Sequence, residues 1–324
     1  MARLVPSICF VLLILLLCIE AQAGRLGPTP DDEGEETFLN IYARNGEDPC
    51  HLCLIHSVVS GFSSQSLMVE ALRKIGKEMV KKDWDFSVDP CIKHPSWDTT
   101  KSKLRPTYQN SVFCNCSKPA DKSSRVCHVV QLCLEGQDLD GVPPPSLVKL
   151  PFLQKMSFNV NKLSGPIPSF LGNITTLKTL ILENNLFSGI IPPQLGDFVN
   201  LECLKLSSNN LTGELPISLT NLTRLDEFRI SRNNFTGRIP DIFQRWKVIR
   251  KLEIQASGLE GPIPPSISVL SSLTELRISD LFGEGSKFPL LSNMTGMTKL
   301  MLRSCNLFGT IPANISEMEE LRTL

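Results

Sequence analysis

Apolar residues recur along this chain with a constant period of 24 residues from Val129 onward. The copies follow one another without insertion or deletion as far as Glu320, and residues 321–324 open a ninth copy. A fixed period of this length is typical of solenoids, in which each coil buries its apolar side chains against its neighbours. The eight complete copies begin at Val129, Leu153, Leu177, Leu201, Leu225, Ile249, Leu273 and Met297.

Each copy follows the pattern L-x-x-L-x-L-x-x-N-x-L-x-G-x-I-P. Apolar residues at the fourth and sixth places, such as Leu180 and Leu182, predict a short strand with one buried face. Asparagine at the ninth place predicts a ladder of amides bonded to the main chain of their own and the adjacent coil, because a buried amide is costly unless it is satisfied. The expected ladder consists of Asn161, Asn185, Asn209 and Asn233.

Glycine and proline mark the return segment of each copy. Glycine holds the thirteenth place in all eight copies, from Gly141 to Gly309, which predicts a turn that no side chain tolerates. Proline stands three places later in seven of the eight, from Pro144 to Pro312. Its fixed φ suits an extended segment without ladder bonding.

The seventh copy departs from this pattern. It has Leu281 at the asparagine place, Gly283 where a leucine is expected, and Phe288 where proline is expected. Irregular units often carry function, but a purely structural kink explains the same departure. In the eighth copy Cys305 takes the asparagine place, which predicts a buried thiol in the ladder.

The ends of the stack differ. Ser66 can start a helix whose Leu72, Ile75 and Met79 share one face, and Trp84 and a cysteine cluster follow, so we expect a cap over the first coil. No comparable cap follows the ninth copy, which predicts an exposed apolar edge and hence a fragment or a truncated gene model.

The first residues have the features of a signal peptide. An apolar run of 12 residues spans Ile8 to Ile19 and precedes the small-residue site Ala21-Gln22-Ala23. The alternative is a membrane anchor, which needs roughly 20 residues. No later stretch approaches that length, so we expect no membrane span in this chain.

The expected domains are a signal peptide at 1–23, an atypical disordered segment at 24–66, the cap at 67–128, eight repeats at 129–320 and a ninth begun at 321–324.

Because the environment of an exported protein is oxidising, we expect the cysteines of this chain to form disulfides. Four of them cluster, namely Cys91, Cys114, Cys116 and Cys127. We expect the disulfides Cys91–Cys114 and Cys116–Cys127, one of the three pairings that four cysteines allow. Zinc is the alternative, but a single residue separates Cys114 from Cys116, whereas zinc ligands are usually separated by two to four. The C-x-x-C at 50–53 lacks a second pair, which disfavours metal or redox use.

Leu163 to Pro168 reads L-S-G-P-I-P, which is similar to the plant extracellular form of the leucine-rich repeat. The repeats of this chain thus resemble those of plant leucine-rich-repeat receptor-like kinases. More specific motifs are similar to the subfamily whose ectodomain continues into a malectin-like domain, a transmembrane helix and a serine/threonine kinase. They cover residues 81–91, 114–117, 254–259, 277–281 and 302–306.

The resemblance extends over about residues 67 to 324. It implies an α/β solenoid, a right-handed leucine-rich-repeat superhelix of 24-residue plant-type repeats with a disulfide-bonded N-terminal helical cap. It also implies that catalysis belongs to a kinase that this chain lacks. Residues 24–66 have no counterpart in the subfamily, and their acidic composition predicts a disordered tail or an intron read as coding sequence.

The sequence itself disfavours chemistry in the repeats. All four histidines precede the first coil, so the coils cannot assemble a histidine-based triad. Kinase and phosphate-loop motifs are absent. The 33 basic and 33 acidic residues balance, which gives no reason to expect a nucleic-acid partner. We therefore expect a non-enzymatic chain without cofactor or metal.

Recognition by the strand face is the better hypothesis, since repeat proteins present extended surfaces. The fifth, seventh and eighth places of each copy are expected to face solvent, beginning with Cys133 and Ser157 at the fifth place. A mixed, soluble face is the plain interpretation. The sharper one is a basic stripe that holds an acidic peptide or a carboxylate, weakened by charge reversal at Arg229 and Arg277. The candidate ligand-binding residues are Lys205, Arg229, Arg232, Gln255, Arg277, Asp280 and Arg303.

Seven N-x-S/T sequons fit an exported glycoprotein. Asn115 is disfavoured because both of its neighbours are expected to be bridged. The expected glycosylation sites are Asn173, Asn210, Asn221, Asn234, Asn293 and Asn314.

Two functions compete. The first is the ectodomain of a receptor-like kinase, extracellular or at the plasma membrane, which binds a peptide, a wall-derived ligand or a co-receptor ectodomain. The second is a secreted inhibitor of microbial wall-degrading enzymes, similar to polygalacturonase-inhibiting proteins.

Overall fold

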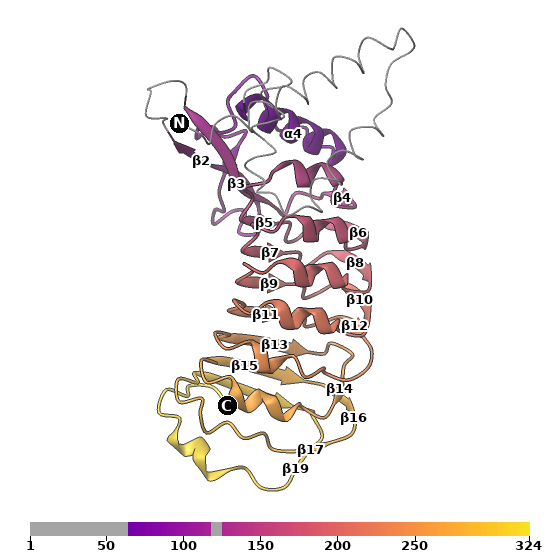
Figure 1. Ribbon diagram of the computed structural model, residues 1–324, viewed down its shortest axis with the longest axis vertical. Coiled ribbons are helices and arrows are strands. Elements are labelled where there is room, and N and C mark those ends of the chain that lie inside the picture. The colour runs from indigo at the N-terminus through magenta and orange to yellow at the C-terminus, as the bar shows by residue number, and fades with distance from the viewer. Residues whose placement is uncertain (1–63, 118–124) are drawn as a thin grey trace, which may run out of the picture. The chain divides into compact units, whose positions relative to one another are not determined.

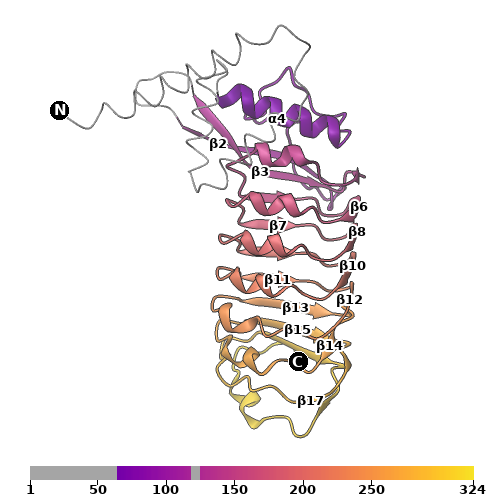
Figure 2. The ribbon, with the colours of Figure 1, turned by 45° about the vertical axis from the view of Figure 1, so that its right-hand side comes forward.

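The computed structural model describes residues 64–117 and 125–324, shown in colour in Figures 1 and 2. The expected signal peptide, nearly all of the segment 24–66 and the C-x-x-C at 50–53 lie outside the described residues. The described residues form a single stack of coils that follows one N-terminal α-helix (Figure 1).

A ten-stranded sheet runs along one side of the stack in the order β1-β2-β3-β5-β7-β9-β11-β13-β15-β18. From β3 onward the strands are parallel, and each residue pairs with the residue 24 positions later, as Leu180 does with Leu204. The predicted period therefore sets the register. The strands span Asp98–Thr99, Gln109–Ser117, Val126–Glu135, Lys155–Ser157, Thr179–Ile181, Cys203–Lys205, Glu227–Arg229, Lys251–Gln255, Glu275–Ser279 and Lys299–Arg303.

A second set of short parallel strands follows the asparagine turn. Five of them form one sheet in the order β12-β10-β8-β6-β4, and two separate pairs, β14 with β16 and β17 with β19, continue it. Figure 2 shows these strands along the edge of the stack. In chain order they span Asp140–Gly141, Lys162–Pro166, Leu186–Gly189, Asn210–Gly213, Asn234–Phe235, Glu260–Gly261, Phe282–Gly283, Ser286–Lys287 and Leu307–Phe308.

The return segments carry 3-10 helices. Each follows its repeat's proline directly, except η5, whose coil has Pro240 three residues earlier. The helical part of the expected α/β class is thus 3-10 in the coils and α only in the cap. The helices η1 to η7 span Pro145–Lys149, Ser169–Asn173, Pro193–Asp197, Ile217–Asn221, Phe243–Arg245, Pro265–Val269 and Ala313–Glu317.

The core fills the space between the strands and the 3-10 helices. Leu180, Leu204 and Leu206 are fully buried, as the fourth and sixth places predict. Trp246 fills the same interior, and its indole nitrogen donates a hydrogen bond to the Leu219 carbonyl oxygen at 3.0 Å. One coil could not exclude water from these side chains, so neighbouring coils stabilise one another.

The asparagines form the ladder that the ninth place predicts. Asn209 donates from Nδ2 to the carbonyl oxygens of Leu182 at 2.9 Å and Leu206 at 3.0 Å. Its Oδ1 accepts from the amide of Phe187 at 3.0 Å. Cys305 substitutes in the eighth coil, where its thiol donates to the Arg303 carbonyl oxygen at 3.2 Å.

The glycines at the thirteenth place do not all serve one purpose. Six of the eight have positive φ, but Gly261 and Gly285 do not. A Cβ on Gly261 would lie 2.6 Å from the Glu284 carbonyl oxygen, and one on Gly285 would overlap the carbonyl oxygen of Asn306. A side chain is excluded at these two positions by the close approach of main chains, whereas at the other six a positive φ favours glycine.

The cap joins the first coil without a break. Helix α4, Ser64–Glu78, begins two residues before the expected Ser66 and buries Leu72 and Ile75. Strand β3 belongs to both parts, because it pairs with β2 on one side and β5 on the other. The boundary expected between residues 128 and 129 thus falls inside a strand.

Two disulfides close the cap, and they join the pairs expected from the sequence, Cys91 with Cys114 and Cys116 with Cys127. The sulfur atoms of Cys91, Cys116 and Cys127 lie within 4.8 Å of one another. Because these atoms are bonded to other sulfurs, they present no thiolate to a metal ion.

Candidate ligand-binding face

The outward side of β9, β11, β13, β15 and β18, here called the strand face, carries most of the candidate residues. Lys205, Arg229 and Arg277 alternate with buried neighbours, so their side chains face solvent. Each is half-buried among the side chains of adjacent coils. The sequence places them correctly on one face.

Carboxylates interleave the expected basic stripe in the fifth and sixth coils. Glu227 lies 2.9 Å from Lys205 Nζ and 2.5 Å from an Arg229 nitrogen. Glu253 lies 3.6 Å from the other side of the Arg229 guanidinium. Burial acts to raise the pKa of Glu227, but the bond from Lys205 and the charges of Lys205 and Arg229 outweigh it, so the pKa is lowered. Two cations are thus matched by two carboxylates.

Around Glu275, cationic side chains outnumber the carboxylates that they contact. Its carboxylate lies 3.5 Å from Lys251, 3.7 Å from Arg277 and 3.4 Å from Lys299. Burial raises the pKa of Glu275, but the surrounding cations, Lys251 and Lys299 foremost, lower it overall. Three cations therefore share the carboxylate of Glu275, and this group of four residues is called the Glu275 cluster.

The remaining candidate residues lie along one edge of the strand face. Arg303 is 3.6 Å from Asp280, and Gln255 donates to the sulfur of Met301 at 2.9 Å. Arg232 is exposed, and its side chain forms no hydrogen bond or ion pair within residues 64–117 and 125–324. It stands at the eighth place with φ of 53°, so its side chain leaves from a left-handed turn.

The N-terminal end of the sheet does not contribute to this surface. Cys133 and Ser157, expected to face solvent, are 1% and 0% exposed. The cap covers them: Lys101 pairs with the buried Glu135 at 2.5 Å, and Glu135 accepts a hydrogen bond from Ser157 at 2.6 Å. Burial raises the pKa of Cys133 to about 11. The strand face is therefore open only from the third coil onward.

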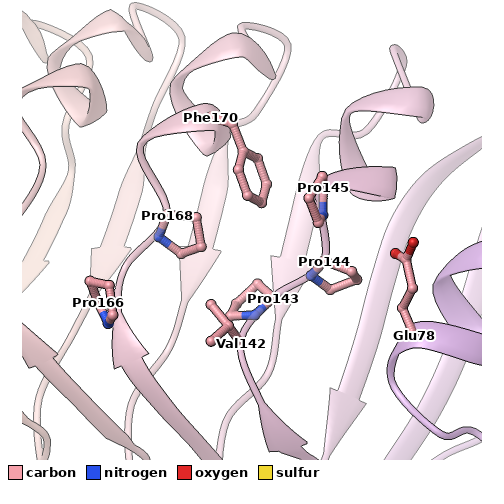
Figure 3. A pocket seen from close by; sticks show the side chains of 8 residues that line it. All are labelled: Glu78, Val142, Pro143, Pro144, Pro145, Pro166, Pro168 and Phe170. Carbon is pink, nitrogen blue, oxygen red and sulfur yellow. The ribbon is translucent and has the colours of Figure 1, made fainter. Parts of the chain in front are cut away.

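Two hollows border the described residues of the coils. One, lined by Arg229, Lys251 and Glu275 among others, has a volume of ≈ 10 Å³, which is too small for a ligand. A wider hollow of ≈ 500 Å³ lies at the cap and the first two coils (Figure 3). Prolines, Phe170 and Val142 line it, and Glu78 is its single charged residue. It brings together no groups for acid-base or nucleophilic chemistry.

The described histidines do not form a catalytic site either. His94 lies 2.8 Å from the Ser96 hydroxyl, a local contact between residues two positions apart, and neither borders the hollows. The ring of His128 stacks on Phe152 with 3.9 Å between centroids, and burial lowers its pKa. Neither histidine has a nucleophile and an orienting group in line.

Five expected glycosylation asparagines are exposed: Asn173, Asn210, Asn221, Asn234 and Asn293. The side chain of Asn314 lies outside the described residues. Asn115 is exposed, but both of its neighbours are bridged. None of the helices in ranges 64–117 and 125–324 is long and apolar enough to cross a membrane.

Known proteins share this architecture. The Leucine Rich Repeat family matches residues 176–198, 200–222 and 224–246. A probable leucine-rich-repeat receptor-like serine/threonine-protein kinase of Arabidopsis thaliana is 42% identical over 145 residues, which cover 36% of this chain and 14% of the relative. A second such kinase from the same plant is 43% identical over 156 residues, 40% of this chain and again 14% of the relative. The match thus spans a small part of either kinase.

Solved ectodomains of plant receptor kinases are also similar to this chain. The ectodomain of the Arabidopsis receptor kinase HAESA, in complex with the peptide hormone IDA and the co-receptor SERK1, has a TM-score of 0.54 and 32% identity over 58% of this chain and 31% of that one. The ectodomain of GASSHO1/SCHENGEN3 with CASPARIAN STRIP INTEGRITY FACTOR 2 has a TM-score of 0.54 and 28% identity, covering 60% of this chain and 23% of that one. The SOBIR1 ectodomain has a TM-score of 0.50 and 28% identity, covering 61% and 97%.

Proposed function

We propose that this chain, a leucine-rich-repeat solenoid similar to ectodomains of plant receptor kinases, is an exported, non-catalytic recognition module that binds an acidic peptide on its strand face. A co-receptor ectodomain is a further partner, by analogy with the HAESA complex, which contains both a peptide and a co-receptor. The kinase relatives favour a receptor over the secreted-inhibitor alternative. Signalling then depends on a kinase domain outside the described residues.

The Glu275 cluster is the observation that carries this proposal. Lys251, Arg277 and Lys299 each approach Glu275 within 4 Å, so their combined charge exceeds that of the one carboxylate between them. An incoming peptide carboxylate can pair with these partly exposed cations while Glu275 keeps its own ion pairs. Hydrogen bonds to charged groups contribute roughly 1.5–3 kcal/mol each, which is enough to orient a peptide.

The test compares two arginines at the same place of different coils. Arg277 belongs to the Glu275 cluster, whereas Arg229 is already held by Glu227 and Glu253. The probe is a fluorescent nonapeptide pool with one fixed aspartate or glutamate, and a matched pool carries the amide instead. We expect Arg277→Glu to weaken binding of the acidic pool about tenfold or more, because roughly 1.4 kcal/mol corresponds to a factor of ten. Arg229→Glu should have a smaller effect.

Arg245→Glu is the control, since Arg245 is exposed on the 3-10 helix η5, away from the strand face. Circular dichroism melting must show that each variant is folded. Equal binding of the acidic pool to the wild type and Arg277→Glu, or no preference of the wild type for the acidic pool, would remove the assignment.

A further inference from the structure

Two of the exposed sequons lie side by side on the second sheet. Asn210 begins β10 and Asn234 begins β12, and these strands are parallel neighbours. Each asparagine has a threonine two residues later, Thr212 and Thr236, so each is a complete acceptor sequence. The two asparagines are 24 residues apart. The register of the two strands sets Asn234 opposite Thr212, two residues beyond Asn210, and the two asparagine side chains reach each other across this offset.

Their side-chain amides are in direct contact. Asn234 Nδ2 donates to Asn210 Oδ1 at 2.5 Å. The Nδ2 atom is the one that receives the sugar, and in this contact the Nδ2 of Asn234 is held against the amide of Asn210. An acetamido sugar is wider than the space between the two amides. Two such sugars cannot both be attached while the two amides keep this contact.

We propose that Asn210 and Asn234 form a single glycosylation position, at which the folded chain carries a glycan on either asparagine but not on both. The donor is an oligosaccharide linked to a lipid diphosphate. In the transfer, Nδ2 forms a bond to sugar C1, the bond from C1 to the diphosphate oxygen breaks, and Nδ2 loses one proton. A chain modified at both positions cannot stack its fourth and fifth coils and is not secreted.

The neighbouring coils limit the effect to this pair. The equivalent place is Leu186 in the preceding coil and Gly258 in the following one, and neither can be glycosylated. Asn221 provides a matched isolated sequon. It ends η4, and its equivalents in the adjacent coils are Asp197 and Arg245.

The measurement counts glycans on a single peptide. Lysines flank but do not interrupt residues 206–247, so a lysine-specific protease releases one peptide that contains Asn210, Asn221 and Asn234. The chain is secreted from a glycosylating eukaryotic host, and the mass of this peptide is compared before and after enzymatic deglycosylation. We expect two glycans on the wild-type peptide, one at Asn221 and one shared by the pair.

Variants that keep both asparagines test the sharing. Thr212→Ala and Thr236→Ala should each leave two glycans, because the other asparagine is then modified. The double variant should carry one. Thr223→Ala, which removes the isolated Asn221 sequon, should also carry one and serves as the control. Three glycans on the wild type, a loss in either single variant, or a bare pair beside a modified Asn221 would overturn the inference.

The inference rests on the proposed export, and the same peptide separates the two failures. A peptide bare at all three positions would refute export through a glycosylating compartment and the inference with it. A modified Asn221 together with two glycans on the pair would leave the export proposal standing and overturn only the sharing.

Discussion

Single residues fix where one coil meets the next. Asn209 bonds to main-chain groups of its own coil and the preceding one, so it satisfies polar atoms that the surrounding leucines shield from water. Cys305 supplies a single thiol donor in the eighth coil, near the carbonyl oxygens of Ile278 and Arg303, where an asparagine has two N–H donors. The ladder therefore explains why a polar residue is retained at the edge of an apolar core.

Replacing Asn209 by leucine should cost about 3 kcal/mol of unfolding free energy, because one amide and two carbonyl groups lose their partner. Urea denaturation followed by circular dichroism measures this loss. Asn200→Ala is the control and should cost less than about 1 kcal/mol, because it removes only solvent-accessible bonds, one from Asn200 Nδ2 to the Thr175 carbonyl oxygen and one from Arg224 to Asn200 Oδ1. Equal losses in the two variants would contradict the role of the ladder.

The eighth place shows what sequence reading misses at this scale. Val160, Ser208 and Ala256 all have positive φ there, although none is glycine or asparagine. The main-chain bonds to the next coil hold this turn, as in Val160 to Glu183 at 3.1 Å and Ser208 to Ser231 at 2.8 Å. Because a tertiary contact imposes the conformation, local residue preferences could not reveal it.

The coils differ in how closely their main chains approach those of the neighbouring coils. In the seventh coil Gly283 takes the positive φ that the thirteenth place has in six of the other coils, and β17 pairs with β19 in a separate two-stranded sheet. The departures at Leu281, Gly283 and Phe288 were visible in the sequence. Their structural consequence was not, because it depends on where the eighth coil places the Asn306 carbonyl oxygen.

Gly285→Ala should destabilise the stack by about 1–3 kcal/mol, the range for overpacking, because the new Cβ would overlap that carbonyl oxygen. Gly296→Ala is a matched control in the same coil. No atom lies within 4 Å of its Cβ position, and its φ is not positive, so it should be neutral or slightly stabilising. Thermal melting compares the two. A Gly285→Ala variant as stable as Gly296→Ala would show that the coils separate easily.

Across the whole stack, the repeat predicted the order and register of the long sheet, since a constant period leaves only one way to align the coils. It also placed the candidate cations on one face. The expected stripe considered the fifth, seventh and eighth places and omitted the third, which supplies Glu227 and Glu275 two residues away on the same side. Ion pairing between coils then decides which cations stay in excess.

That ion pairing makes stability depend on pH in a defined direction. The pKa values of Glu227 and Glu275 lie below the ordinary 4.5, so their contribution is present above that pH and is lost as the pH falls through the lowered values. Glu227→Gln should therefore be less stable than the wild type at neutral pH, and the difference should shrink below about pH 4. Denaturation curves at successive pH values measure it. Glu202→Gln, an exposed residue 4.0 Å from Lys178, should follow the wild-type curve. A constant gap between Glu227→Gln and wild type would show that Lys205 and Arg229 do not hold this carboxylate.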